Sequence, residues 1–280
     1  MSFEFQEIPR VERLSVKQFK QEYLAKQKPV VIEKLTEDWP AYSLWNFEYI
    51  REKAGDKVVP LYDNEPVKAE DGFNEPRTKM PMRDYLDLLQ SGPTDLRIFL
   101  YNLIRETPDL QQDYAYPDLG VKFLKGFPML FLGGENARVF MHYDIDLANI
   151  FHFHFVGEKD CIIVPPEQSE NMYKIPLSVI CREDIDFDAP DFKRFPKLQQ
   201  LKPYKTRLSH GEMLYMPEGY WHYMKYVTPG FSMSLRSLPT HKLHLAQALY
   251  NLFIMRHADG MLRKMLGQKW IDYKNKCAMQ

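Results

Sequence analysis

The chain has few cysteines and no long apolar run. Its 280 residues include three cysteines, Cys161, Cys181 and Cys277, which are far apart and odd in number. This argues against a disulfide framework and for a reducing compartment, so we expect a cytoplasmic protein. No stretch approaches about 18 uninterrupted apolar residues, and the acidic N-terminal stretch lacks the basic and apolar regions of a signal peptide. We therefore expect no membrane span and no secretion.

Excess charge of either sign is also missing. The 37 basic residues balance 38 acidic ones, for a net charge of -1, so no general attraction to nucleic acid or to an anionic membrane is expected. The sequence has no G-x-G-x-x-G, P-loop, G-x-S-x-G or H-E-x-x-H motif. It therefore gives no support for a dinucleotide-binding enzyme, a P-loop NTPase, an α/β-hydrolase or a zinc metalloprotease. What is present is 45% hydrophobic and 14% aromatic residues, enough for the core of an ordinary globular protein.

The first hundred residues alternate helical and extended patterns. Residues 15–27 begin with Ser15 as an N-cap and place apolar residues at helical spacing until Pro29 ends the pattern. By the same criteria we expect further helices over residues 44–54 and 81–90, and strands over residues 30–32, 57–62 and 96–103.

From about residue 127 onward, many short strands separated by Gly, Pro and Asn predict a β-sandwich or barrel. A polar insertion with one short helical turn interrupts them between residues 169 and 203. After Pro239 the sequence is helical. We therefore expect one main domain over residues 1–239 and a helical appendage over residues 240–280. The Met- and Leu-rich appendage either packs on the barrel or forms a homodimer interface.

Two short motifs hold the candidate metal ligands. His142 and Asp144 are one residue apart at the end of an expected strand, and His222 follows the turn at residues 216–219 on another strand. Two imidazoles and one carboxylate can occupy one face of an octahedron and leave the other positions open, as in non-haem Fe(II) oxygenases. His-x-Asp alone is weak evidence. From this spacing alone, a structural role is as well supported as a metal site: His142 would be an ordinary histidine at a strand end, and Asp144 would form a turn.

The sequence around these motifs resembles the JmjC branch of the cupin-type Fe(II)/2-oxoglutarate oxygenases. The resemblance rests on HYD at residues 142–144, GEKDCIIVPPEQSENMY at 157–173, FDAPDFKRFP at 187–196 and GEMLYMPEGYWHYM at 211–224. These stretches are especially similar to the asparaginyl hydroxylases of hypoxia-inducible factor and their bacterial cupin-like relatives. The similarity covers about residues 127–238, and the region before it fits more loosely.

The resemblance implies a mainly β fold, a double-stranded β-helix of the jelly-roll or cupin type, with N-terminal α/β elements and C-terminal helices. It also implies use of Fe(II), 2-oxoglutarate and O2. His142, Asp144 and His222 would hold the metal, and Lys159 would pair with the distal carboxylate of 2-oxoglutarate. Without that role, Lys159 would be a solvated lysine after the Gly157 turn.

Two positions depart from the family pattern. Many relatives have a hydroxyl three residues before the first histidine and a tyrosine on an earlier strand, where this chain has Val139 and Phe99. Each lost hydrogen bond to a charged acceptor would cost about 1.5 to 3 kcal/mol if nothing replaced it. Tyr101, which shares a strand face with Phe99 by period two, and Arg236 are candidate replacements. Arg236 is equally a structural or surface arginine.

The strand at residues 151–155 alternates phenylalanine and histidine, so one face is aromatic and the other carries imidazoles. If the imidazole face lines the barrel, His152 stands where some relatives place an asparagine that contacts 2-oxoglutarate; the alternative turns the phenylalanines inward. Asn149 is a second candidate for that role, but it is out of phase unless a bulge intervenes. Four other histidines fit no ligand pattern: His210, His241, His244 and His257.

We therefore predict an Fe(II)- and 2-oxoglutarate-dependent dioxygenase, a hydroxylase of a protein or peptide side chain. A small molecule or a tRNA base is the alternative substrate, and the balanced charge disfavours nucleic acid. Two other hypotheses stay open. One is a non-catalytic cupin-like protein, which is supported by the absence of hydroxyl groups at Val139 and Phe99. The other is a metal-dependent cupin that does not use 2-oxoglutarate and therefore does not need Lys159.

Overall fold

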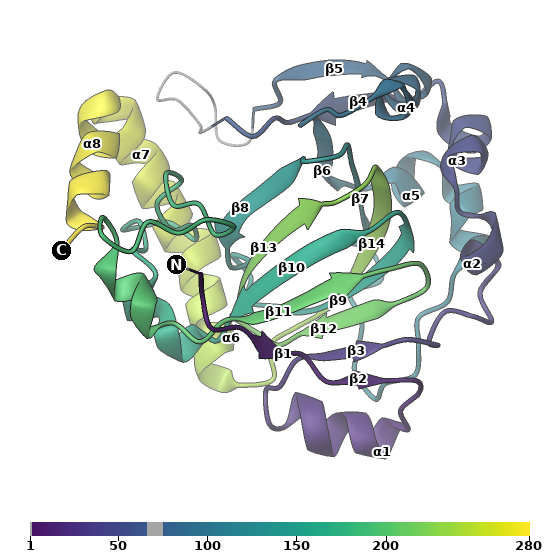
Figure 1. Cartoon of the computed structure of the whole chain (residues 1–280), viewed down its shortest axis with the longest axis horizontal. Helices are drawn as coiled ribbons and strands as arrows, with labels where there is room; N and C mark the ends of the chain where they lie inside the picture. The colour runs from purple at the N-terminus through teal and green to yellow at the C-terminus, as the bar shows by residue number, and fades with distance from the viewer. Residues whose placement is uncertain (1, 66–74) are drawn as a thin grey trace.

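The computed structural model describes residues 2–65 and 75–280, and two β-sheets form its centre (Figure 1). The smaller sheet has the strand order β1-β11-β10-β13-β8. Its strands are β1 (Gln6–Glu7), β11 (Tyr204–Leu208), β10 (Lys159–Val164), β13 (Trp221–Tyr226) and β8 (Arg138–His142). The larger sheet has the order β2-β3-β12-β9-β14-β7-β6. Its strands are β2 (Arg10–Val11), β3 (Val30–Ile32), β12 (Met213–Met216), β9 (Asn149–Val156), β14 (Gly230–Ser237), β7 (Met129–Gly133) and β6 (Arg97–Tyr101). The predicted mainly β fold with flanking helices is confirmed.

The two sheets pack face to face through a small apolar cluster. It joins Ile150 and Leu214 of the larger sheet to Cys161, Ile163 and Met224 of the smaller one. Strand side chains alternate between faces, so the neighbours of these residues point outward. On the larger sheet that outer face belongs to the main core, which N-terminal helices cover.

The phenylalanines of β9 belong to this outer core. Phe153 and Phe155 pack against Trp39 and Trp45, at ring-centroid distances of 5.0 and 4.8 Å. The aromatic rings remove a large apolar area from water here, and the histidines of β9 consequently face the interior between the sheets. Of the two orientations considered for the Phe-His strand, the structure has the one with the imidazoles inside.

The N-terminal elements follow the predicted pattern with one break. Ser15 caps a helix that runs as α1 (Val16–Gln18) and the π-helical η1 (Phe19–Leu24). The helix expected over residues 44–54 is two helices, because Trp45 is extended and Asn46 caps the second one through Tyr49 N at 2.9 Å. The elements before β6 are α2 (Pro40–Leu44), α3 (Phe47–Ala54), β4 (Val58–Leu61), β5 (Thr78–Pro81) and α4 (Met82–Ser91). Between β6 and β7 lie α5 (Leu103–Glu106) and η2 (Pro108–Asp113).

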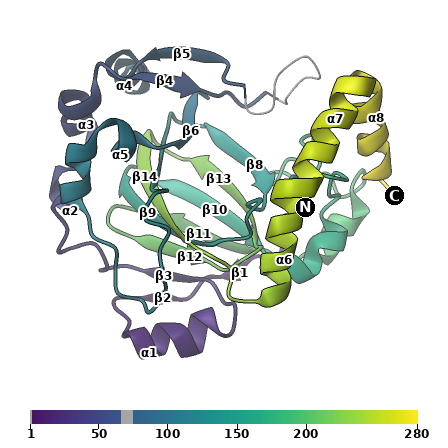
Figure 2. The same ribbon diagram turned by 180° about the vertical axis from the view of Figure 1, so that it is seen from behind.

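The insertion and the C-terminal helices lie at one end of the barrel (Figure 2). The insertion contains two short 3-10 helices, η3 (Pro166–Asn171) and η4 (Pro196–Gln200), not the single turn expected. The C-terminal helices are α6 (Lys242–Tyr250), η5 (Asn251–Met255), α7 (Arg256–Leu266) and α8 (Gln268–Cys277). None of the helices in the described part of the chain has the length and apolar character that a membrane crossing needs.

Candidate metal centre and co-substrate pocket

His142 and His222 lie side by side on neighbouring strands, and Asp144 follows shortly after the first of them. His142 is the last residue of β8 and pairs in register with His222, near the start of β13. Their ring centroids are 4.1 Å apart, and His142 Nε2 is 3.8 Å from Asp144 Oδ1. One ligand atom from each of the three residues lies within 4.8 Å of the other two. The structure therefore brings the predicted triad together.

The tautomers and charge states of the triad suit a metal ion. His142 Nδ1 is 2.8 Å from Phe140 O, and His222 Nδ1 is 3.2 Å from Tyr220 O. If both Nδ1–H groups donate there, each Nε2 lone pair is left for a metal. Burial and the neighbouring His222 lower the pKa of His142 to about 3, and burial lowers the pKa of His222. Two neutral imidazoles and a carboxylate form the donor set of non-haem iron sites, so these residues fit Fe(II).

Arg236, on β14, reaches the triad from the opposite sheet. Its Nη2 is 3.2 Å from Asp144 Oδ2, and its Nη1 is 3.1 Å from Asp146 Oδ2. Burial alone would raise the pKa of Asp144, but Arg236, His222 and His142 together outweigh burial, and the net shift of the pKa is downward. Its guanidinium thus pairs with two aspartates, one of them a triad member, and the contact of Arg236 with 2-oxoglutarate stays a prediction.

Lys159 is buried in the interior between the sheets, with 2% of its surface exposed. Its Nζ contacts Ser232 Oγ at 2.8 Å and His152 Nε2 at 3.2 Å, and it lies 4.1 Å from the centroid of the Tyr226 ring. No carboxylate within the described residues pairs with it. Burial accordingly lowers the pKa of Lys159 to about 7. A buried ammonium with only neutral partners is a site that an anionic ligand would complete.

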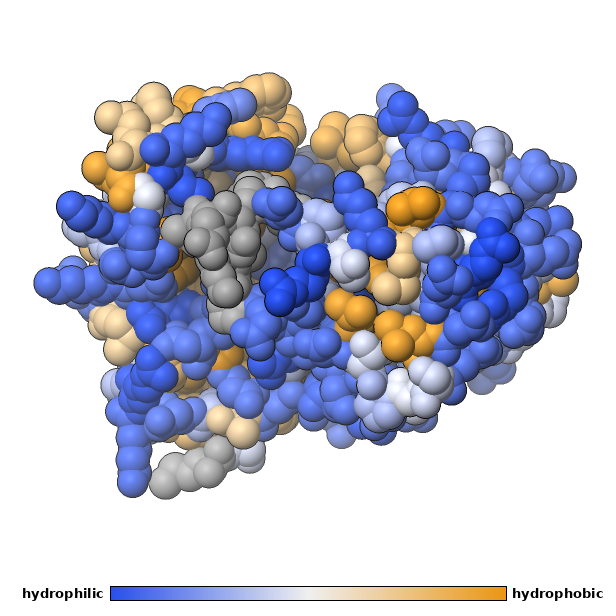
Figure 3. Space-filling model, turned by 90° about the horizontal axis from the view of Figure 1, so that it is seen from above, coloured by the Kyte–Doolittle hydropathy of each residue, from blue (hydrophilic) through white to orange (hydrophobic). Residues whose placement is uncertain are grey.

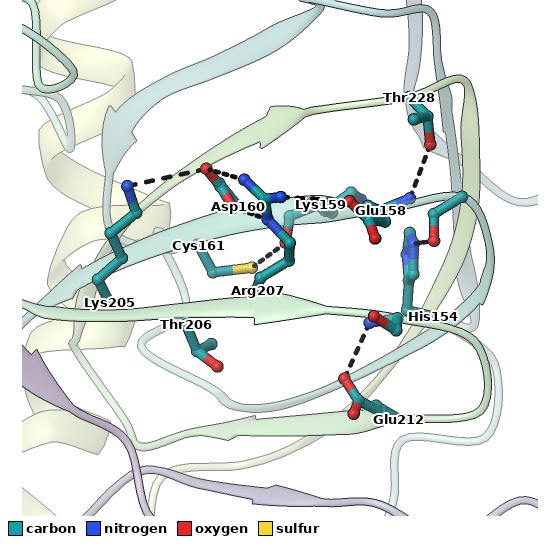
Figure 4. A network of polar contacts seen from close by, with 12 residues as sticks. His154, Glu158, Lys159, Asp160, Cys161, Lys205, Thr206, Arg207, Glu212 and Thr228 are labelled. Carbon is teal, nitrogen blue, oxygen red and sulfur yellow. Dashed lines mark hydrogen bonds and ion pairs between the residues drawn. The ribbon is translucent and has the colours of Figure 1, made fainter.

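Lys159 faces the same interior as the triad. It lies four residues before Ile163 on β10, on the same face of the strand, and Ile163 pairs in register with His222. The next residue, Asp160, is on the other face, where it pairs with Arg207 and Lys205 of β11 (Figure 4). Four strand residues span about 13 Å, of which the long lysine side chain can cover part, so the separation of the ammonium from the triad is comparable to the length of a short dicarboxylate.

A hydrogen-bonded chain runs behind Lys159. His154 Nε2 is 2.9 Å from Gly157 O, and His154 Nδ1 is 2.7 Å from Ser232 Oγ. This arrangement lets Ser232 donate to the imidazole and accept from Lys159. Ser234, two residues further along β14 on the same face, has a buried hydroxyl without a hydrogen-bond partner. Neither serine was predicted from the sequence, although the alternation of residues 231–236 around Arg236 could have indicated them.

Tyr101 and Asn149 lie outside this pocket. Phe99 faces the site, 6.2 Å from the His142 ring, but Leu100 has φ 52 and the pairing of β6 with β7 shifts there. This irregularity breaks the period-two pattern, and Tyr101 packs against the outer core instead. The side chain of Asn149 makes its hydrogen bonds outside the pocket. Its Oδ1 accepts a hydrogen bond from Tyr215 Oη at 2.7 Å, and its Nδ2 donates one to Leu238 O at 3.3 Å. The structure thus places neither side chain beside Lys159, and their contacts with 2-oxoglutarate stay predictions.

Two of the triad residues, His142 and Asp144, line a cavity of about 1350 Å³. Phe99 and Val139 line the same cavity. Its remaining walls come from the segments flanking the β4–β5 pair, from the insertion and from helices α7 and α8. The C-terminal helices thus form a wall of the site and do more than pack on the barrel.

Comparison with known proteins places this site in a family. The family model of the cupin-like domain matches residues 16–241. Lysine-specific demethylase 8 of Xenopus tropicalis is 28% identical over 81% of this chain and 52% of its own length. Lysine-specific demethylase JMJ30 of Arabidopsis thaliana is 27% identical over 80% of this chain and 54% of its own length. HSPB1-associated protein 1 of Homo sapiens is 29% identical over 76% of this chain and 49% of its own length.

The chain spans about half the length of these curated relatives. The matched region includes the triad, Lys159 and the serines of β14. The similarity to asparaginyl hydroxylases in particular stays a prediction. The chain belongs to the cupin-like domain family, and the resemblance to JmjC-type oxygenases that its sequence indicated is confirmed.

Proposed function

We propose that this protein is an Fe(II)- and 2-oxoglutarate-dependent oxygenase that hydroxylates a side chain of a protein substrate. One observation carries the proposal: a triad of two neutral imidazoles and a carboxylate shares its interior with a buried lysine that has no carboxylate partner. The first half of the arrangement suits Fe(II), and the second suits the distal carboxylate of 2-oxoglutarate.

Each residue then has a defined task. His142, Asp144 and His222 would hold the metal, which when bound supplies the chemistry that couples O2 to oxidative decarboxylation of 2-oxoglutarate and oxidation of the substrate. Lys159 binds and orients the co-substrate, and Ser232 holds the lysine in place. Ser234 offers a hydroxyl where Val139 and Phe99 offer none. Arg236 orients Asp144.

The cavity supports a polypeptide substrate. Its volume of about 1350 Å³ exceeds the roughly 300–1,000 Å³ typical of small-molecule pockets. Relatives named lysine-specific demethylases make a lysine side chain one candidate beside the asparagine, aspartate or histidine suggested by the sequence. A small molecule or a tRNA base is the alternative substrate.

An anaerobic titration tests the proposal. Fe(II) and 2-oxoglutarate together should produce a visible charge-transfer band, and oxygen should then release succinate. His222→Ala should give neither signal. A wild-type protein that shows no band and forms no succinate would be the non-catalytic cupin-like alternative. A protein that binds Fe(II) but not 2-oxoglutarate would support the 2-oxoglutarate-independent one.

The substrate is tested by mass spectrometry of lysate proteins incubated with enzyme, Fe(II) and 2-oxoglutarate. Hydroxylation adds one oxygen atom to a peptide, whereas demethylation removes a methyl group. The His222→Ala protein is the control. Modified tRNA in place of modified peptides would replace the proposed substrate class.

Two further properties belong to the proposal. A cytoplasmic location is supported by three free cysteines, Cys161, Cys181 and Cys277. A homodimer through the C-terminal helices is supported by exposed apolar side chains on α6, η5 and α7. Hydrophobic side chains gather over the end of the molecule that carries these helices (Figure 3).

A further inference from the structure

Glu218 is a fully buried carboxylate outside the catalytic triad. It lies in the turn between β12 and β13, four residues before His222, and has 0% exposure. Its oxygens accept hydrogen bonds from Thr240 N at 2.6 Å, Thr240 Oγ1 at 3.1 Å and His241 N at 3.2 Å. Within the described residues no lysine or arginine pairs with it. A buried carboxylate without a cation is costly, so its environment must supply positive charge in another way.

The groups that can supply it are two histidines at the start of α6. His241 is the N-cap of the helix and His244 lies one turn further on, so both imidazoles project from the same side. His241 Nδ1 contacts Glu218 Oε1, and His244 Nδ1 lies 3.5 Å from the same oxygen. His244 Nδ1 is buried and has no hydrogen-bond partner among the described residues. The three donor atoms lie within 4.8 Å of one another.

We propose that Glu218, His241 and His244 form a second metal site, selective for an ion of the Zn²⁺ class. Two imidazoles and a carboxylate are common zinc ligands, at about 2.0–2.2 Å from the ion. A divalent cation among them would neutralise Glu218 and occupy the unpaired lone pair of His244. His241 is half exposed, which leaves a path for the ion and a position for water.

The site would fasten two functional parts of the molecule together. Glu218 belongs to the turn that leads into His222, and the two histidines begin the helix that continues into α7, a wall of the catalytic cavity. A metal ion here would therefore hold the C-terminal helices against the metal-binding end of β13.

Zinc binding by the full chain tests the proposal. The protein His142→Ala/His222→Ala lacks the catalytic site, so any tight Zn²⁺ that remains reports the second one. Competition with a chromogenic chelator should reveal one bound equivalent, and Co²⁺ in its place should give visible ligand-field bands. Adding His244→Ala should weaken binding on the order of 100-fold, because one of three protein ligands is lost. Adding His257→Ala, a change at an exposed histidine of α7, should leave it unchanged.

Two results would overturn the site. One is a folded His142→Ala/His222→Ala protein that binds no Zn²⁺ equivalent. The other is an equivalent that persists unchanged after His244→Ala. If the His244 variant does not fold, His241→Ala at the more exposed position provides the same measurement, and retained binding there counts against the proposal equally. A merely hydrogen-bonded helix cap would give no Co²⁺ spectrum.

Discussion

Lys159 is central to the proposed function because its ammonium group is buried among neutral partners. Ser232 and His152 each satisfy one N–H, and the Tyr226 ring faces the charge, but none of these groups is an anion. An added carboxylate would replace the interaction with water that the ammonium lost on burial. The lysine is thus prepared for a ligand whose charge is opposite to its own.

Replacing Lys159 with alanine should weaken 2-oxoglutarate binding by about 10- to 150-fold and leave Fe(II) binding nearly unchanged. The estimate follows from a hydrogen bond to a charged group, worth about 1.5–3 kcal/mol. Isothermal titration under anaerobic conditions measures both affinities. Lys205→Ala, on the outer face of β11, is the matched control and should bind both normally. Equal 2-oxoglutarate affinity in the Lys159 variant would refute the assigned role.

The affinity for 2-oxoglutarate should also depend on pH. Burial lowers the pKa of Lys159 to about 7 in the free protein, and a bound carboxylate would raise it by favouring the charged form. Binding above pH 7 then requires proton uptake. Affinity should be full below about pH 7 and fall above it, by up to about tenfold per pH unit. Titrations between about pH 6 and pH 9 check this, and Lys159→Ala should lose most of the dependence.

Arg236 should matter for the metal more than for the co-substrate. Its guanidinium contacts Asp144 and Asp146, so Arg236→Gln removes the group that fixes the orientation of a metal ligand. We expect Fe(II) affinity to fall about 10- to 100-fold, as is common when a partner of a ligand is lost. Arg207→Gln, at a more exposed arginine of β11, is the control. Unchanged Fe(II) affinity together with weaker 2-oxoglutarate binding would instead support the predicted contact of Arg236 with the co-substrate.

At the scale of elements, β7 and β14 are shaped by an aromatic ring of the opposite sheet. Gly133 of β7 pairs with Gly230 of β14, and a Cβ atom at Gly133 would overlap the Tyr226 ring. The same ring lies over the Lys159 ammonium. Because Gly133 has no side chain, the Tyr226 ring has room to pack there and to lie beside Lys159.

Gly133→Ala should destabilise the protein by about 1–3 kcal/mol, because the tightly packed ring must move. Urea unfolding measures the change in free energy of unfolding. Gly126→Ala is a suitable control, since a Cβ there meets no heavy atom within 4 Å. If the two variants are equally stable, the ring is free to shift and the pocket is less rigid than the packing indicates.

Elements with strong local patterns were predictable from sequence. Ser15 caps its helix, and the alternation of β9 placed its histidines in the interior. The irregularity at Leu100 was not predictable, because nothing in the sequence shows that a leucine adopts a positive φ. One such residue moved Tyr101 from the expected face to the other. Period-two reasoning fails wherever tertiary packing imposes a bulge.

At the scale of the molecule, the metal triad was the easier part to predict, because its residue types and spacing suit few other purposes. The environment of Lys159 was harder, because it depends on which strand lies opposite: the serines come from β14, far away in sequence. The buried cluster around Glu218 was missed for the same reason. It joins a turn between strands to a helix that begins more than twenty residues later.

The C-terminal helices expose a continuous apolar stripe. Leu243 and Ile254 are each more than half exposed and lie on one side of the helical run, where Met261 and Met265 extend the apolar stripe to the rim of the catalytic cavity. Exposed apolar stripes of this kind commonly mark protein interfaces. We therefore expect light scattering to give a mass of twice 33.3 kDa in solution.

Charges placed on this stripe should separate the subunits. Phe253 is 67% exposed and Ile254 is 58% exposed, so the variant Phe253→Glu/Ile254→Glu loses little packing within the chain but buries two charges in the interface. We expect it to run as a monomer with an unchanged circular dichroism spectrum. Leu44→Glu, at a 41% exposed position on α2, should remain a dimer. A wild-type protein that is monomeric at every concentration would refute the proposed homodimer.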